Sequence, residues 1–181
     1  SSVINISFRE GSRKKFYSDI NLSIAGFGVI AEGPLGDKGS LMFSVRRSYL
    51  ELIKSAIRLT SVPNYWDFNF KANYDAGPND KLTLIGLLGL DKVDFSGESA
   101  EDNPFGNSNV NQKTLGVGIN YTRLFKKGYL ETVLSDSHTD NYIIQIDGQT
   151  AFVKFENNSD NNEIILRSNL NYQLSKLYTL N

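Results

Sequence analysis

The feature that most constrains the fold is an unbroken alternation of apolar and polar residues between positions 65 and 75. Trp66, Phe68 and Phe70 occupy even positions, and the odd positions between them are polar. Successive side chains of a β-strand point to opposite faces, so this segment predicts a strand with one aromatic face and one polar face. The breakers at 77–80 then predict a tight turn into an antiparallel partner strand.

The same alternation recurs in several segments, most of them longer than the usual strand of about five or six residues. Residues predicted to share the apolar face, or an aromatic girdle at its rim, are Trp66, Phe68, Phe70, Leu82, Leu84, Leu88, Val117, Ile119, Leu166 and Leu170. Residues predicted on the opposite, polar face are Arg46, Asp67, Asn69, Lys71, Asn120, Arg167 and Asn169. The sequence therefore predicts an all-β chain of about eight antiparallel strands.

The predicted connections fall into two classes that alternate along the chain. Short turns are expected at 33–39, 77–80, 125–128 and 175–176. Long loops are expected at 49–63, where helical spacing suggests a short helix, at 97–111, and at about 142–162. Alternating short and long connections between long antiparallel strands are typical of an outer-membrane β-barrel, with short periplasmic turns and long extracellular loops. The alternation of faces predicts that the apolar face contacts lipid and the polar face lines the lumen.

Composition excludes several classes of protein. The 181 residues carry a formal net charge of −1, so no basic field predicts nucleic-acid binding. There is no cysteine, which excludes disulfides and thiolate metal sites. The sequence contains no apolar run of about 20 residues, so no transmembrane helix is expected. It does not open with a signal peptide, so we expect that the chain either is cytosolic or lacks its beginning.

Two alternatives to a segment of a large barrel remain open. The strand number and length also permit a self-contained eight-stranded barrel. A soluble β-rich binding module would alternate in the same way, although more Lys and Glu and shorter strands are expected on its outer face. Detergent dependence would separate the soluble module from both barrels.

The sequence resembles the TonB-dependent outer-membrane receptors. The resemblance covers nearly the whole chain and is carried by residues 1–6, 32–35, 43–50, 65–74 and 79–82. It implies a barrel of about 22 strands closed by an N-terminal plug. Residues 1–11 would then be the last plug strand, and residues 12–181 the first part of the barrel.

The resemblance also implies a function and partners. Such a receptor imports a bulky nutrient across the outer membrane of a Gram-negative bacterium, with energy passed through TonB. The implied partners are the lipid bilayer, the protein's own plug domain, TonB and a nutrient ligand of unidentified class. No cofactor, nucleic acid or enzymatic activity is implied.

Few residues suggest chemistry. His138 is the only histidine and is interpreted as a solvated lumen residue rather than a general base or metal ligand. Asp67, Lys71 and Asp75 alternate on one face and suggest an ion-pair ladder along the interior. Arg46 is expected to face the lumen and contact the plug, whereas Arg47 is expected near the membrane edge.

Overall fold

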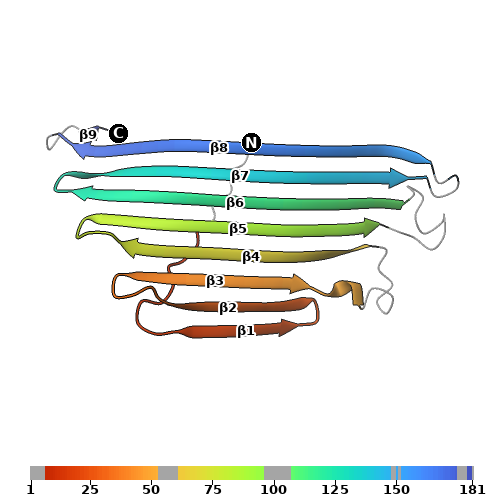
Figure 1. The fold of residues 1–181 in the computed structure, drawn as a ribbon, viewed down its shortest axis with the longest axis horizontal. Coiled ribbons are helices and arrows are strands. Elements are labelled where there is room, and N and C mark those ends of the chain that lie inside the picture. The colour runs from red at the N-terminus through yellow and green to blue at the C-terminus, as the bar shows by residue number, and fades with distance from the viewer. Residues whose placement is uncertain are drawn as a thin grey trace.

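The chain forms one open antiparallel sheet in which sequence neighbours are always spatial neighbours (Figure 1). The computed structural model describes residues 7–52, 61–95, 107–147, 150, 152–174 and 179–180. The strands are β1 Tyr17–Ser23, β2 Gly26–Pro34, β3 Gly39–Ser48, β4 Ser61–Asp75, β5 Asp80–Phe95, β6 Asn107–Phe125, β7 Gly128–Ile146, β8 Val153–Gln173 and β9 Thr179–Leu180. The 3₁₀-helix η1, Leu50–Leu52, follows β3, and no α-helix occurs in the described ranges. The all-β, antiparallel prediction is confirmed.

The sheet does not close on itself within the described part of the chain. β1 pairs with β2 at one edge, and β8 pairs with the two-residue β9 at the other. The self-contained eight-stranded barrel is therefore not formed by these strands. A wider barrel stays a prediction.

The short turns are confirmed where the structure describes them. Residues 35–38, 76–79 and 126–127 join successive strands at the same end of the sheet, which we call the turn end (Figure 1). Gly36 takes a φ of 62°, a left-handed conformation that glycine adopts without steric cost. The turn expected at 175–176 lies outside the described residues.

The long loops were predicted to include residues that belong to the neighbouring strands. The helix expected within 49–63 is limited to η1 in the described residues, because β4 already begins at Ser61 and 53–60 lie outside them. β6 begins at Asn107, so the loop predicted at 97–111 ends earlier than expected. The predicted strand before Glu10 is also wrong where it can be checked, since Ser7 and Phe8 are not in a strand.

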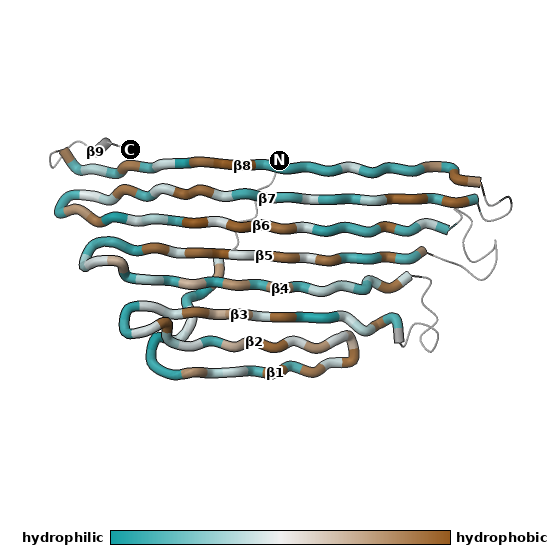
Figure 2. Tube along the Cα trace, in the orientation of Figure 1, coloured by the Kyte–Doolittle hydropathy of each residue, from teal (hydrophilic) through white to brown (hydrophobic). Residues whose placement is uncertain are grey.

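The polar segment 156–162, predicted as a loop, is the middle of strand β8. Its residues pair with polar residues of β7, for example Asp160 with Asp140, and also with Ile143 and Ile144. Figure 2 shows hydrophilic residues dominating these parts of β6, β7 and β8. Backbone pairing does not need an apolar face, so composition alone misidentified this segment.

The register assigns each side chain to one of two faces, because paired residues of neighbouring strands point the same way. The face carrying Phe68, Leu88 and Leu115 is called the apolar face. The face carrying Asn69, Thr83 and Asn120 is called the polar face. The alternation predicted from the sequence holds in β4, whereas Ile85 and Leu87 of β5 lie on the polar face and Asp136 of β7 lies on the apolar face.

The apolar side chains form a band that crosses the strands obliquely. Paired residues form rows, and the row through Trp66 is apolar on β1, β2, β4 and β5 but charged on β3 and on β6–β8: Leu22, Phe27, Arg47, Trp66, Leu90, Lys113, Asp140 and Asp160. Three rows nearer to the turn end, the row is apolar or glycine throughout: Gly33, Leu41, Ala72, Leu84, Ile119, Leu134 and Leu166.

On β5 the apolar band ends at Leu90. On β8 it ends at Ile164, which lies two rows nearer to the turn end than Leu90 does. Two rows correspond to roughly 13 Å along a strand. Strands that tilt across a level slab meet its boundary at different register positions, and barrel strands tilt in this way.

The sheet is a single layer with almost no hydrophobic core. Met42 and Val62 are the only buried hydrophobic side chains among the described residues. On the interior strand β6, Val117 and Ile119 remain 42% and 43% exposed on the apolar face. Among the described residues, nothing covers this face over β6.

Candidate functional site

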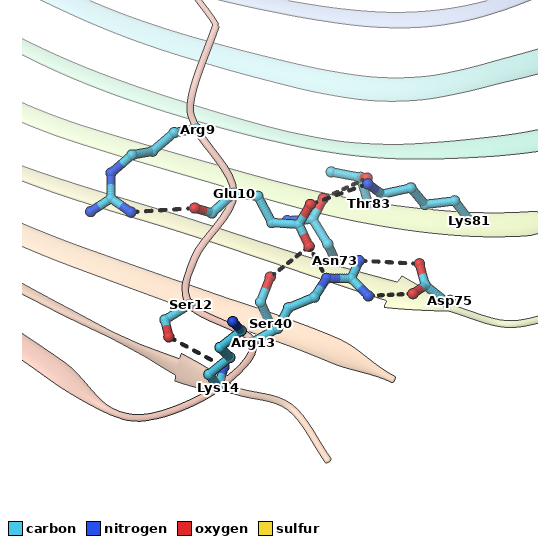
Figure 3. A network of polar contacts seen from close by, with 10 residues as sticks. All are labelled: Arg9, Glu10, Ser12, Arg13, Lys14, Ser40, Asn73, Asp75, Lys81 and Thr83. Atoms are coloured by element: carbon cyan, nitrogen blue, oxygen red, sulfur yellow. Dashed lines mark hydrogen bonds and ion pairs between the residues drawn. The ribbon is translucent and has the colours of Figure 1, made fainter. Parts of the chain in front are cut away.

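The polar face carries a segment of the chain's own N-terminal region. Residues 7–15 run across β5, β4 and β3 before the chain enters β1 (Figures 1 and 3). Every sheet side chain that forms a hydrogen bond or ion pair with this segment, as described below, lies on the polar face. We call residues 7–13 the docked segment.

Glu10 is the centre of the docked segment's polar network. Ser40 Oγ donates a hydrogen bond of 3.1 Å to one carboxylate oxygen of Glu10, and Lys81 Nζ lies 3.3 Å from the other. The guanidinium of Arg13 also pairs with Glu10 and reaches Asp75 at the end of β4 (Figure 3). The carboxylate is thus held by groups from β3 and β5 at once.

Two further contacts flank this network. Lys71 Nζ donates a hydrogen bond to the backbone carbonyl of Phe8, and Arg9 forms an ion pair with Glu32. The docked segment is therefore held by charged groups from β2, β4 and β5 and by the Ser40 hydroxyl of β3. Charge-assisted hydrogen bonds of this kind are stronger than neutral ones.

The docked segment also makes close steric contact with the sheet. A Cβ atom added to Gly11 would lie 2.5 Å from the carbonyl oxygen of Leu41, so only glycine fits at this distance. Ser40, Met42 and Asn73 are buried, and they lie together on the polar face beneath or beside the segment. Asn73 accepts a 3.0 Å hydrogen bond from Thr83 Oγ1.

The electrostatics of the network favour an ionised Glu10. Partial burial alone raises the pKa of this carboxyl group, but hydrogen bonds from Arg13, Lys81 and Ser40 outweigh it and lower the pKa below its ordinary value. The hydrogen bond to Asp75 raises the pKa of Arg13 further, so this side chain stays charged. The arrangement is a docking contact built mainly from ionised groups.

The predicted site residues fall into two groups by face. Trp66, Phe68, Phe70, Leu82, Leu84, Leu88, Val117, Ile119, Leu166 and Leu170 all lie on the apolar face. Arg46, Asp67, Asn69, Lys71, Asn120, Arg167 and Asn169 all lie on the polar face. Which medium each face contacts stays a prediction.

The polar-face residues have different partners from those expected. The ladder predicted among Asp67, Lys71 and Asp75 is wrong: Asp67 pairs with Arg46 at 3.0 Å, and the other two contact the docked segment. Arg46, expected to contact the plug, is therefore paired within the sheet. Asn69 donates to Ser44 Oγ at 3.2 Å, and Asn120 donates to Glu131 at 2.8 Å.

Sequence reasoning missed most of the docking residues. Glu10, Ser40, Lys81 and Glu32 were not singled out, although the last three lie on the polar face by the same alternation that identified Lys71. A signal was present in Glu10-Gly11-Ser12-Arg13, a charged segment around a glycine immediately before the first barrel-like strand. The segment's partners lie far away in the sequence, so this signal did not indicate which residues it contacts.

His138 lies on the opposite face from the one predicted. It pairs in register with Leu115 and Asn162 on the apolar face, beyond the edge of the apolar band, and its Nδ1 lies 3.4 Å from Asp160. In the described ranges, no group of three or more His, Cys, Asp or Glu residues could hold a metal ion. His138 is a surface residue paired with one aspartate.

Comparison with protein-family models, with curated proteins and with solved structures finds no match. Among the described residues, no helix has the length and apolarity needed to cross a membrane.

Proposed function

We propose that this chain is part of an outer-membrane β-barrel receptor of the TonB-dependent type, which imports a bulky nutrient. In this proposal residues 1–11 end the plug domain and residues 12–181 begin the barrel. The observation that carries the membrane assignment is the uncovered apolar face of the interior strands, such as Val117 and Ile119 on β6. A face of this kind is stable in contact with lipid and unstable in water.

Strand length supports the same assignment. β4 to β8 contain 15 to 21 residues each, whereas a tilted membrane strand needs about 9–11 residues. The excess projects beyond the apolar band on β6–β8, where the apolar face carries the charged residues Lys113, Asp140 and Asp160. A soluble sandwich would bury its inner face along the whole strand, so this change of medium within one strand favours a bilayer.

The docked segment supports the receptor type. A chain that enters the barrel from a plug has to cross the lumen face before it joins the first strand, and residues 7–13 lie on the polar face in this way (Figure 3). Together with the sequence resemblance, this placement favours a plugged receptor over an open pore. The nutrient class depends on loops and plug surfaces outside the described residues.

Nitroxide labels on single cysteines in the complete protein test the membrane assignment. Labels at Leu84 and Ile119 should be reached by oxygen in the bilayer, and labels at Thr83 and Asn120 by a water-soluble nickel chelate. Within the Trp66 row, a label at Leu90 should report lipid and one at Asp160 should report water. The opposite pattern between the faces would favour a soluble sandwich and remove the membrane assignment.

Growth tests address transport. The complete protein, expressed in a Gram-negative host that lacks its own receptors, should support growth on one iron chelate, cobalamin, glycan or peptide only when the host contains TonB. Growth on such a nutrient without TonB would contradict the TonB-dependent proposal and leave a passive pore.

A further inference from the structure

The apolar face contains a cationic hollow at the edge of the apolar band. The hollow has a volume of about 480 Å³ and is lined by residues of β3 to β7. Its cationic side chains are Arg47, Lys92 and Lys113, and its aromatic side chains are Trp66 and Tyr142. The register places all five on the apolar face, in the Trp66 row and the row next to it.

The hollow is lined by three cations and two acids, Asp91 and Asp140, and its cations have different partners. The Arg47 guanidinium lies 4.7 Å from the Trp66 ring centroid, its Nη2 is 3.6 Å from Glu51, and its buried Nε has no hydrogen-bond partner in the described structure. Lys92 lies 3.3 Å from Asp94. Lys113 forms no ion pair with any described residue, although it is adjacent in register to Asp140, the one acid on the apolar face that lines the hollow.

The hollow continues directly into apolar surface. One row nearer to the turn end lie Phe68, Leu88 and Leu115, and the Trp66 ring stacks on Phe68 with centroids 5.8 Å apart. A ligand that fits this surface has an anionic group at the Arg47–Lys92–Lys113 level and a hydrocarbon tail along the band. Free anions, acidic peptides and nucleic acids would use the charges and leave the adjoining apolar surface in water.

From this juxtaposition we propose that the hollow binds the phosphate of an anionic membrane lipid. The assignment rests on the proposed membrane function, because it needs the apolar band to lie in a bilayer. Arg47 and Lys92 would contact the phosphate from neighbouring sides, and Lys113, which forms no ion pair with a described residue, would supply a third positive charge. Trp66 and Tyr142 lie at the level where aromatic residues border a membrane.

The orientation follows from the side of the sheet on which the hollow lies. It is at the end opposite the short turns, which is the extracellular end in outer-membrane barrels. The ligand would therefore be a phosphate-bearing lipid of the outer leaflet. Clusters of Lys and Arg next to a membrane strengthen binding of anionic lipids in a roughly additive way.

The test uses the complete protein, purified in mild detergent and mixed with equal amounts of phosphatidic acid and phosphatidylcholine. Native mass spectrometry counts the bound lipids of each kind. The unmodified protein should retain one phosphatidic acid with at least tenfold preference over phosphatidylcholine. A variant with Arg47→Gln, Lys92→Gln and Lys113→Gln should lose most of this preference.

A matched control removes the same amount of charge at the turn end of the same sheet. The Arg123→Gln, Lys126→Gln and Lys127→Gln variant should keep the preference, because these residues do not line the hollow. Equal loss in both triple variants would overturn the site and indicate general attraction of anionic lipid to positive charge.

A second arm replaces the lipid with inorganic phosphate. If phosphate alone binds to the hollow and phosphatidic acid shows no preference, the site takes a free anion and the lipid assignment is wrong. Heat-modifiable migration and flotation with phosphatidylcholine vesicles report folding and insertion of every variant. Failure of the unmodified protein to insert would defeat the proposed membrane function, whereas insertion without lipid preference would defeat only the headgroup site.

Discussion

The two faces of this sheet share one backbone but differ in what covers them. The polar face is covered where the docked segment crosses it, and Ser40, Met42 and Asn73 are buried there. The apolar face is richer in hydrocarbon, yet among the described residues nothing packs over Val117, Ile119 or Leu134. In water the chain would be expected to cover the apolar face first.

This difference shows that the position of the docked segment is not set by hydrophobic burial. Ion pairs and a close glycine contact hold it on the polar face, through Glu10, Gly11 and Arg13. The apolar face is left available for contact outside the chain. The polar face and the apolar face are therefore adapted to two different media.

The largest effect is expected from a charge placed in the apolar band. Leu84→Arg should lower the free energy of unfolding in lipid vesicles by about 2–4 kcal/mol, because Leu84 lies in the row that is apolar or glycine throughout. Guanidinium titration of the complete protein measures the change. Ser135→Arg, at the next register position on the polar face, should cost about 1 kcal/mol or less.

Equal costs at positions 84 and 135 would contradict the contrast between the faces. Asn111→Arg provides a second control on the apolar face, beyond the edge of the band, and its cost should be close to zero. A cost at position 111 as large as at position 84 would show that the band does not mark a bilayer.

How far the sequence predicted this structure depends on the range of the interactions involved. Alternation at positions 65–75 and 114–124 identified strands, faces and short turns, because a strand's period of two is a local property. It failed at 156–162, where β8 is polar on both faces and only pairing with β7 reveals a strand. Loop boundaries were overextended for the same reason.

The docking residues required information that local pattern does not contain. Glu10 meets Ser40 and Lys81 across 30 and 71 positions of sequence. Lys71 was identified because it alternates within a strand, but its partner, the carbonyl of Phe8, has no signature in the sequence. Alternation indicated which face was polar and could not indicate what lies on it.

A second prediction concerns the close contact of the docked segment. Gly11→Ala should weaken docking by about 1–3 kcal/mol, because its Cβ would meet the Leu41 carbonyl oxygen. Hydrogen–deuterium exchange of residues 7–13 should rise while exchange in β4 and β5 stays unchanged. Gly28→Ala is the control, since a Cβ there lies 3.4 Å from the flexible Arg46 side chain and can be accommodated. Unchanged exchange in Gly11→Ala would show that the close approach is not maintained in solution.

The smallest effect is expected from the charge of Glu10. Its lowered pKa means that ionised Glu10 stabilises docking above its ordinary pKa of 4.5, and that this contribution is lost as pH falls below that value. Glu10→Gln removes the contribution at neutral pH, where we expect a loss of about 1 kcal/mol or less, because the partners are partly exposed and screened. A nitroxide at position 7 should therefore be more mobile in Glu10→Gln at pH 7. The mobilities of the two proteins should converge as the solution is acidified.

Glu163→Gln, on the same polar face but remote from the segment, should leave both mobility and its pH dependence unchanged. An unmodified protein whose label becomes more mobile as pH rises from 4 to 7 would reverse the sign of this linkage. Docking would then not depend on the Glu10 carboxylate, and the close contact at Gly11 would remain as the main determinant of which face the segment covers.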